Sequence, residues 1–321
     1  MFAFIVRRLL YSIPVLLATS FLIFTAVSLS GDPAAKVKQN PKFSPATYQQ
    51  LRQKYKLDKP IPVRYVYWLK DVTTHKLGNS LVTQQPIWPD IKRVMSHTAQ
   101  LILTAVFIAV LIGILVGVYS AIRQYSIFDY FATTLSFLGF AMPTFWLALL
   151  LQILFVNIYL KWNVRIFYTS GLNSPGEGAF SLDRLQHLAL PVATLVTISF
   201  AFYSRYMRAS MLEVINSDYV RTARAKGVVE WRVILHHVFR NALIPLVTVI
   251  ALDVGGLLGG AIITETVFSL DGMGHYFIDR LNQQDLYAVM AWLMVTAVII
   301  ILANLLADIA YGYLDPRIRY S

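Results

Sequence analysis

The sequence contains no cysteine and has few charged residues. Its 321 residues include 17 Asp and Glu and 28 Lys and Arg, and charged residues make up 14% of the chain. The lack of cysteine excludes disulfide bonds, Cys-ligated metal sites and thiol nucleophiles. A soluble globular domain carries about 25% charged residues. The shortage of charge therefore argues against a single core surrounded by water.

Other signatures are absent too. No G-x-x-x-x-G-K-[ST] phosphate loop occurs in the sequence, so the chain cannot bind ATP by that device. There is no internal repeat and no low-complexity tract. His236 and His237 are adjacent, so on a helix they point in different directions, unlike an i, i+4 metal pair. With no hydrolytic triad, metal cluster or paired carboxylates in context, we predict no catalytic residues and no metal site.

Long apolar runs are what the sequence has in excess. Hydrophobic residues make up 57% of the chain, and a bilayer core is crossed by about 20 apolar residues in a helix. Five runs contain no Asp, Glu, Lys or Arg: 9–31, 94–122, 130–160, 185–204 and 286–307. A sixth, 241–264, contains one charge, Asp253. The sequence therefore predicts an all-α integral membrane protein with six transmembrane helices.

These runs divide the chain into three parts. We expect the N-terminus and the first transmembrane helix in 1–31, a small external domain in 32–93, and a five-helix core in 94–321. The helices of that core are expected at about 94–122, 130–160, 185–204, 241–268 and 286–312, with a segment at 205–240 between the third and fourth of them. The first run is too long for the apolar region of a signal peptide, so we expect it to remain as an anchor.

The basic residues predict the orientation. With the N-terminus inside, the inside segments hold twelve Lys and Arg, whereas the two short outside loops hold four. The positive-inside rule then places both termini in the cytoplasm. Segment 32–93 would lie outside although it also carries twelve Lys and Arg, because loops this long translocate largely regardless of charge. Within it we expect a helix over 45–57, a turn at 60–62 and an amphipathic stretch over 63–72.

The longest cytoplasmic stretch, 205–240, has the pattern of helix, turn and helix. Apolar residues recur at helical spacing on both sides of Gly227, which is typical of a helix C-terminus or tight turn. The residues alone leave two interpretations open. The segment is either a lipid-headgroup anchor held by Lys and Arg or a docking site for another protein.

One motif in this stretch resembles a known family. Residues 218–227, DYVRTARAKG, are similar to the cytoplasmic "EAA" loop of the permeases of binding-protein-dependent ABC importers, and most similar to the oligopeptide/dipeptide branch. Arg221 and Thr222 stand where many importers have Glu and Ala. Phe239 and Arg240 stand where a Leu-Pro usually follows the glycine, and Pro245 comes later.

The similarity extends over nearly the whole chain. Each match is weak alone, but their order and the six runs make the combination specific. The matching segments are Gly31-Asp32-Pro33, Leu77-Gly78-Asn79-Ser80-Leu81, Pro143-Thr144-Phe145-Trp146, Gly259-Gly260-Ala261, Glu265-Thr266-Val267-Phe268, Asn304 to Asp308 and Leu314 to Arg319.

The resemblance implies a non-catalytic transport subunit in the inner (cytoplasmic) membrane of the cell. Such a permease pairs with a second homologous permease, two ATP-binding subunits and an external substrate-binding protein, and it contacts membrane lipid but no nucleic acid. ATP and Mg²⁺ would be bound by the ATPase subunits, with no cofactor in this chain. The cargo implied is di- or oligopeptides. Related permeases take nickel, glutathione or other small solutes, and a stand-alone secondary transporter is a further alternative.

The resemblance also assigns roles to the motif. A short helix around 218–227 would dock in a groove of one ATPase, and closure of the ATPase dimer would tilt the transmembrane helices. The residues expected to couple in this way are Asp218, Tyr219, Arg221, Ala223, Arg224, Ala225, Lys226 and Gly227. Ala223 and Ala225 would allow close docking, the three basic residues would face an acidic groove, and Gly227 would supply the turn.

Two carboxylates are candidates for the translocation path. Asp253 is the only ionisable residue deep in an apolar run, where such residues face protein or water. It would either line the path or pair with a polar residue of the partner permease. Glu265 would either contribute to the path or be an ordinary carboxylate at the membrane interface.

Small residues and proline suggest where helices pack or bend. Gly255, Gly256, Gly259 and Gly260 form two small-xxx-small pairs, which favour close helix packing, with a pore-lining role as the alternative. Pro143 should bend the third helix, for packing or for gating along the path. Asn304 and Asp308 lie four residues apart, so we expect hydrogen bonds from this face to a neighbouring helix.

Overall fold

The chain folds into helices joined by short connections. The computed structural model describes residues 2–29, 45–54, 56–74, 77–178, 181–258 and 261–314. Within these ranges it contains no β-strand, and a single antiparallel bridge joins Asn79 to Pro86. Six helical segments are long and apolar enough to cross a membrane: Ile5–Leu29, Ile87–Ile122, Thr144–Trp162, Leu182–Ile215, Glu230–Leu257 and Leu286–Ile309. The protein is thus a multi-pass, all-α membrane protein.

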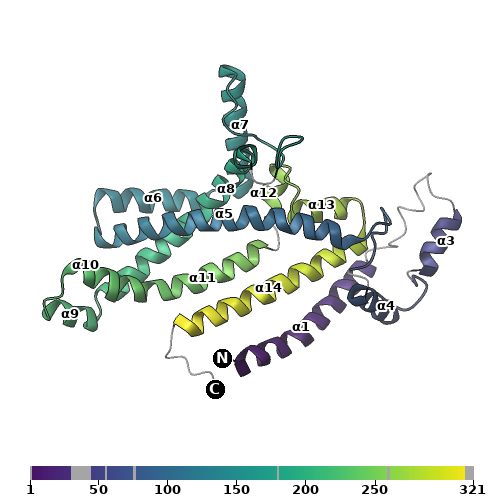
Figure 1. Ribbon diagram of the computed structural model, residues 1–321, viewed down its shortest axis with the longest axis horizontal. Helices are drawn as coiled ribbons and strands as arrows, with labels where there is room; N and C mark the ends of the chain where they lie inside the picture. Colours follow the sequence, from purple (N-terminus) through teal and green to yellow (C-terminus); the bar gives the residue numbers. More distant parts are fainter. Residues whose placement is uncertain are drawn as a thin grey trace.

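Most long helices run side by side along the long axis of the molecule (Figure 1). They are α1 (Phe2–Leu29), α5 (Ile87–Ile122), α11 (Arg240–Leu258) and α14 (Leu286–Leu314), with α8 (Leu182–Ile215) crossing beside α5. The short helices α9 (Asp218–Ala225) and α10 (Glu230–Arg232) lie at one end of this bundle, here called the α9 end. Helices α3 (Pro45–Lys54) and α4 (Ile61–Thr74) lie at the opposite end, the α4 end.

Helices α5 and α8 pack closely against each other. A Cβ atom added to Gly113 of α5 would lie 2.8 Å from Cβ of Tyr203, and one added to Gly117 would lie 2.6 Å from the carbonyl oxygen of Ser204. Gly113 and Gly117 are four residues apart and therefore share a helix face, so the two backbones approach where side chains would keep them apart. This contact fixes the centre of the bundle.

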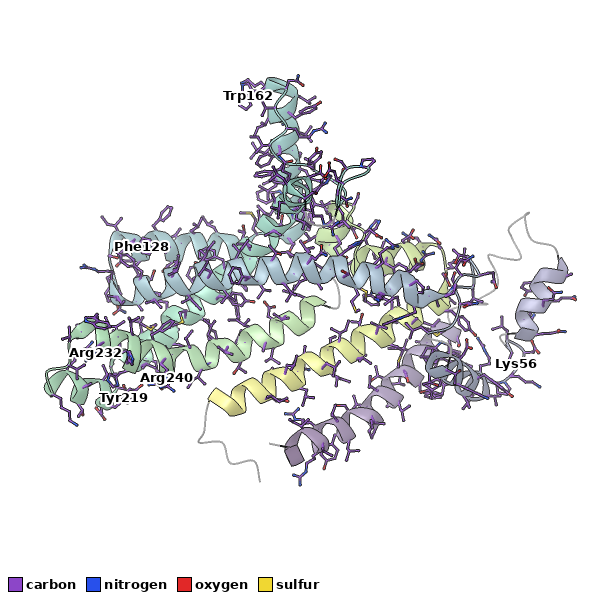
Figure 2. The ribbon with its side chains drawn as sticks, viewed as in Figure 1. Lys56, Phe128, Trp162, Tyr219, Arg232 and Arg240 are labelled. Atoms are coloured by element: carbon purple, nitrogen blue, oxygen red, sulfur yellow. The ribbon has the colours of Figure 1, made fainter. Side chains whose placement is uncertain are left out.

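The apolar run 130–160 is two helices. Helix α6 (Ile127–Ala141) ends before Pro143, and α7 (Thr144–Trp162) begins after it and stands at a large angle to the bundle, with Trp162 at its far tip (Figures 1 and 2). Met142 is extended, with ψ 122°, because a residue before proline is disfavoured in the α-helical region. The sequence predicts a bend at Pro143, and the structure has a complete break.

The apolar run 241–264 is also interrupted. Helical structure is continuous from α10 through the π-helix η1 (Val233–Phe239) and α11 to Leu258. A separate short helix, α12 (Ile262–Val267), follows, and then α13 (Met273–Asn282). The expected helix over 241–268 therefore ends about ten residues early, near the run of glycines.

Helix α8 extends beyond its apolar run at both ends. It was expected over 185–204, but it begins at Leu182, where Ser181 accepts a hydrogen bond from the backbone N–H of Arg184 as N-cap, and it runs to Ile215. No glycine or proline interrupts 205–215, so the helix continues past the end of the apolar residues. The first part of the expected surface segment 205–240 is thus a continuation of α8.

Helix α4 packs against α1 through aromatic side chains. Phe24 and Trp68 are both buried, with ring centroids 5.4 Å apart, and the hydroxyl of Tyr65 lies 2.7 Å from Ser20 Oγ. The same apolar cluster includes Ile91 and residues of α13 and α14. The described part of 32–93 therefore shares a core with the ends of the long helices.

Buried ion pairs and hydrogen bonds join helices at both ends. At the α9 end, Asp129 at the start of α6 is 2% exposed and accepts hydrogen bonds from Nε and Nη2 of Arg208 on α8, each 2.7 Å long. At the α4 end, Asp285 accepts a hydrogen bond from Ser80 and another, 3.1 Å long, from the backbone N–H of Leu81. The turn that contains Ser80 is thereby held on the start of α14.

The Asp129–Arg208 pair gives a test of the fold. Replacing Asp129 with Ala leaves the partly buried Arg208 guanidinium without its carboxylate, which should cost about 2–3 kcal/mol. We expect a lower midpoint of thermal unfolding for the detergent-purified protein. Asp58→Ala is the matched control, because Asp58 is exposed and 4.0 Å from Arg52, and an exposed pair contributes about 0–1 kcal/mol. Equal midpoints for the two variants would contradict the structure.

Candidate functional site

Helix α9 is an eight-residue helix between α8 and the continuous helical segment that begins with α10. Ser217 is its N-cap residue, Asp218 lies in its first turn and Arg224 in its last. A carboxylate at the N-terminus and a cation at the C-terminus both stabilise the helix dipole. The helix ends at Ala225 with Lys226 as its C-cap residue, and Gly227 follows with a φ of +75°, a backbone conformation that glycine adopts without strain.

One face of α9 packs on the rest of the chain. Val220 and Ala223, three residues apart, are buried in a cluster that includes Met211 of α8 and Val233 and Val238 of η1. Ala223 was expected to face a partner protein, but its side chain is turned inward, because positions 220 and 223 share the inner face. Ala225 is exposed.

The opposite face of α9 is open and charged. The side chains of Asp218 and Arg221 are 99% and 70% exposed, and their ion pair spans 3.6 Å. Thr222 and Lys226 are exposed as well. This face therefore presents three of the predicted coupling residues, Asp218, Arg221 and Lys226. It lies at the end of the molecule where Figure 2 labels Tyr219 and Arg232.

Two side-chain contacts hold α9 on the helix that follows. Arg224 donates two hydrogen bonds to Glu230, from Nε over 3.1 Å and from Nη2 over 2.7 Å. The hydrogen bond to Glu230 raises the pKa of Arg224, so the guanidinium stays charged at any physiological pH. The hydroxyl of Tyr219 accepts a hydrogen bond, 3.2 Å long, from Asn241 of α11. Helix α9 is thus tied to the continuous helix that runs from Glu230 to Leu258.

Asp253 has a partner within the chain. The hydroxyl of Tyr203, which is fully buried on α8, donates a hydrogen bond to Asp253 Oδ2 on α11. Sequence reasoning weighed an open path and a partner subunit for Asp253, but not a tyrosine 50 residues away. Asp253 therefore joins α11 to α8, and its own side chain is half-buried.

Glu265 is buried and held by several donors. Its side chain is 0% exposed. Thr98 of α5 donates a 2.6 Å hydrogen bond to Oε1, and the backbone N–H groups of Gly274 and His275 donate to Oε2 over 2.6 and 3.2 Å. Thr98 also accepts from the backbone N–H of Met273. Glu265 was expected near water, and instead its carboxylate fixes the start of α13 to α5.

The other predicted residues have separate locations. Pro143 is exposed between α6 and α7. Gly255 lies against α14, where an added Cβ would be 2.7 Å from Cβ of Ala303, whereas nothing lies within 4 Å of such an atom on Gly256. Gly259 and Gly260 are outside the described residues. Asp308 forms an ion pair with Arg8 of α1, 3.1 Å long, so that face does bind a neighbouring helix.

Sequence reasoning missed Arg184. It was counted as a loop residue, but it lies in the first turn of α8 and is 4% exposed. Its Nη1 donates to Asn173 over 3.0 Å and its Nη2 to Gln100 of α5 over 2.8 Å. Because Gln100 belongs to the apolar run 94–122, Arg184 reaches the depth of a membrane-spanning helix. No sequence pattern predicts the burial of Arg184, because that burial depends on how α8 packs beside α5.

No cluster suited to a metal ion occurs among the residues that the structure describes: nowhere do three or more His, Asp or Glu side chains gather. The candidate site is the exposed charged surface of α9, which hydrogen bonds join to α10 and α11 and apolar packing joins to α8.

Two family models together match nearly all of the chain. Residues 109–320 match the model for "Binding-protein-dependent transport system inner membrane component", and residues 1–102 match the model for the N-terminal part of such membrane components. The two matches meet within α5.

Individual proteins are similar over their full length. The chain is 39% identical to the "Oligopeptide transport system permease protein AppB" of Bacillus subtilis (strain 168) and 38% identical to the "Dipeptide transport system permease protein DppB" of Escherichia coli (strain K12), with 100% of both chains covered in each case. A solved structure titled "Crystal structure of an amino acid ABC transporter with histidines" matches 70% of this chain and 94% of its own, with a TM-score of 0.53 and 14% identity. At that identity the match concerns the fold.

A substitution at Glu265 tests the hydrogen bonds that join α12, α13 and α5. Glu265→Ala leaves Thr98 and two backbone N–H groups without their acceptor, which should cost about 3 kcal/mol and lower the unfolding midpoint of the purified protein. Glu177→Ala is the matched control, because Glu177 is exposed and its replacement should change the free energy of unfolding by less than about 0.5 kcal/mol. A Glu265→Ala variant as stable as this control would contradict the buried role.

Proposed function

This chain belongs to the family of inner membrane components of binding-protein-dependent transport systems, and from this premise we propose that it is the permease subunit of an ATP-driven importer of di- or oligopeptides. The peptide cargo is supported by the relatives named for oligopeptide and dipeptide transport. In this proposal a second permease completes the path, two ATP-binding subunits supply energy and an external binding protein delivers the peptide. The chain itself is non-catalytic.

The observation that carries the proposal is the exposed charged face of α9. The helix protrudes from one end of the bundle (Figure 1), and the chain has no phosphate loop of its own. A short helix with Arg221 and Lys226 on its open side fits an acidic groove on an ATPase. In this proposal fewer residues contact the ATPase than the sequence predicts, because Ala223 and the Arg224 guanidinium instead hold α9 in place.

Contacts within the chain support a mechanical role for α9. Movement of α9 is passed to α11 through the Tyr219–Asn241 and Arg224–Glu230 contacts. Helix α11 in turn contacts α8 through Asp253 and α14 through Gly255. Because packed helices shift as units, displacement of α9 by the ATPases would reorient α11 relative to α8 and α14 and so alternate access to the path.

We further propose that the α9 end and both termini lie in the cytoplasm. The positive-inside distribution of Lys and Arg supports this orientation, and α9 must face the ATP-binding subunits. Helices α3, α4 and α13 then lie on the outside, where the binding protein would dock. Arg184, near the α4 end of α8, lies on the outward side of the bundle.

Charge reversal tests the docking role of α9. In proteoliposomes that contain the assembled transporter, Arg221→Glu combined with Lys226→Glu should lower ATP-dependent peptide uptake by roughly tenfold or more, since two attractive contacts become repulsive. Arg165→Glu is the control, because Arg165 is an exposed basic residue of the 163–181 connection. Both variants should unfold at the wild-type temperature. Undiminished uptake by the α9 variant would refute the docking role.

Single cysteines test the orientation. The chain has no cysteine, so Lys56→Cys and Lys226→Cys each give one reporter at opposite ends of the molecule (Figure 2 labels Lys56). A membrane-impermeant maleimide should label Lys56→Cys in intact cells or spheroplasts and Lys226→Cys only after the membrane is opened. The reverse pattern would overturn the proposed orientation.

A further inference from the structure

Arg184 is a buried cation with incomplete partners. Its side chain is 4% exposed, and its two terminal nitrogens donate to the neutral amide oxygens of Asn173 and Gln100. Its Nε is buried and has no hydrogen-bond acceptor. A buried charge normally has an oppositely charged partner. The two acceptors of this guanidinium are neutral, so its positive charge is not balanced by an acid.

The acidic residues nearby are engaged elsewhere. Asp183 accepts hydrogen bonds from the backbone N–H and the hydroxyl of Ser174, both 2.7 Å long, and lies 3.6 Å from His187. Two other arginines at the same end do have acid partners: Arg93 pairs with Asp271, and Arg280 lies 3.7 Å from Asp90. Among the described residues, none of the ion pairs includes Arg184.

Arg184 lines a pocket of about 370 Å³ between α5 and α8, a volume within the usual range for small-molecule sites. Gln100 and Thr104 contribute polar groups from α5, and Leu182 and Leu185 contribute apolar side chains from α8. A cation among polar and apolar lining residues suits a ligand that is anionic at one end and apolar beside it.

The exposed face of α5 changes character at this pocket. Ser96 and Thr104 are exposed polar residues on the half of α5 toward the α4 end. Further along the same face, Phe107, Leu111 and Leu115 are 70%, 51% and 62% exposed. Exposed apolar residues suit lipid, whereas polar residues at membrane depth face protein or a water-filled path. Leu103, Leu182 and Leu185 are exposed beside these polar residues, so the pocket lies on a surface of mixed character, with Gln100, Thr104 and Arg184 as its polar side.

We propose that Arg184 is a binding residue for the C-terminal carboxylate of the transported peptide on the outward side of the path. This inference rests on the proposed peptide-import function. An arginine fork binds a carboxylate through two parallel hydrogen bonds, and the two neutral acceptors use only two of the five N–H donors of this guanidinium. The two leucines contact the side chain of the terminal residue, and Thr104 lines the same pocket.

A cysteine at position 104 reports occupancy of the pocket directly. Thr104→Cys is made in this cysteine-free chain, the complex is assembled with its second permease and ATPases, and the rate of maleimide labelling of this chain is followed on gels. Trialanine with a free carboxylate should slow labelling, and trialanine amide should protect roughly tenfold less well at the same concentration, as expected for loss of a charged hydrogen bond. Equal protection by the two peptides would overturn the proposal.

Arg184→Gln in the Thr104→Cys background locates the effect. It should remove the difference between the free acid and the amide, while Arg165→Gln, the matched control on an exposed arginine, should preserve it. If Arg184→Gln does not assemble, Arg184→Lys is used. It keeps the charge without the fork and should retain a reduced difference. If the Arg184 variant shows the same difference in protection between trialanine and trialanine amide as the Thr104→Cys parent, Arg184 is not the carboxylate-binding residue.

Two further outcomes separate this inference from the function itself. If position 104 reacts in the isolated chain but is protected in the assembled complex without peptide, the partner permease fills the pocket and the carboxylate site is refuted. If the wild-type complex takes up no peptide from a binding protein in proteoliposomes, the proposed function fails, whatever the labelling shows. If the complex takes up peptide but the free acid and the amide protect position 104 equally, only the carboxylate site at Arg184 is refuted.

Discussion

The close contact between α5 and α8 is the constraint on which the rest of the bundle depends. Gly113 and Gly117 let the α5 backbone approach Tyr203 and Ser204 of α8. In a membrane the hydrophobic effect does not drive helices together, so such packing and the polar contacts beside it must do so. The contact brings a single stretch of α8 to the centre of the bundle.

From that stretch, polar side chains reach the neighbouring helices. Tyr203 donates to Asp253 of α11, Ser204 lies 3.0 Å from Ser136 of α6, and Arg208 pairs with Asp129 at the start of α6. Each of these groups would be costly if left unpaired at membrane depth. Because every partner must be in place at once, the contacts specify one arrangement of α5, α6, α8 and α11. They also leave α7, which lacks such contacts to the bundle centre, at a large angle from the others (Figure 1).

The sequence predicted composition-driven features well and pair-driven features poorly. Each of the six apolar runs overlaps a helical segment that is long and apolar enough to span a membrane. Such segments can be predicted because their length and lack of charge are local properties of the sequence. The turn at Gly227 was likewise visible, since Gly after a basic helical turn is a local signal. Tyr203 and Asp253 lie 50 residues apart, and their pairing depends on the crossing of two helices. The burial of Glu265 depends in the same way on Thr98, 167 residues away.

Some misjudged residues could have been placed from spacing alone. Val220 and Ala223 are three residues apart on a short helix with exposed charges at 218 and 221, a pattern that predicts an inward face at 220 and 223. Arg184 could not be placed in that way. It looked like a loop cation because it precedes an apolar run, and only the position of α8 beside Gln100 shows that it lies within the bundle.

Helix α8 connects the pocket with the α9 end of the bundle. It begins at Leu182, with Arg184 of the pocket in its first turn, and ends at Ile215, two residues before the N-cap of α9. Its 34 residues extend about 50 Å at 1.5 Å per residue. If both proposals hold, occupancy of the pocket and movement of α9 act on the same helix from opposite ends. A ligand that favours one tilt of α8 necessarily favours the matching position of α9, and by thermodynamic reciprocity a protein bound to α9 alters affinity at the pocket by the same factor.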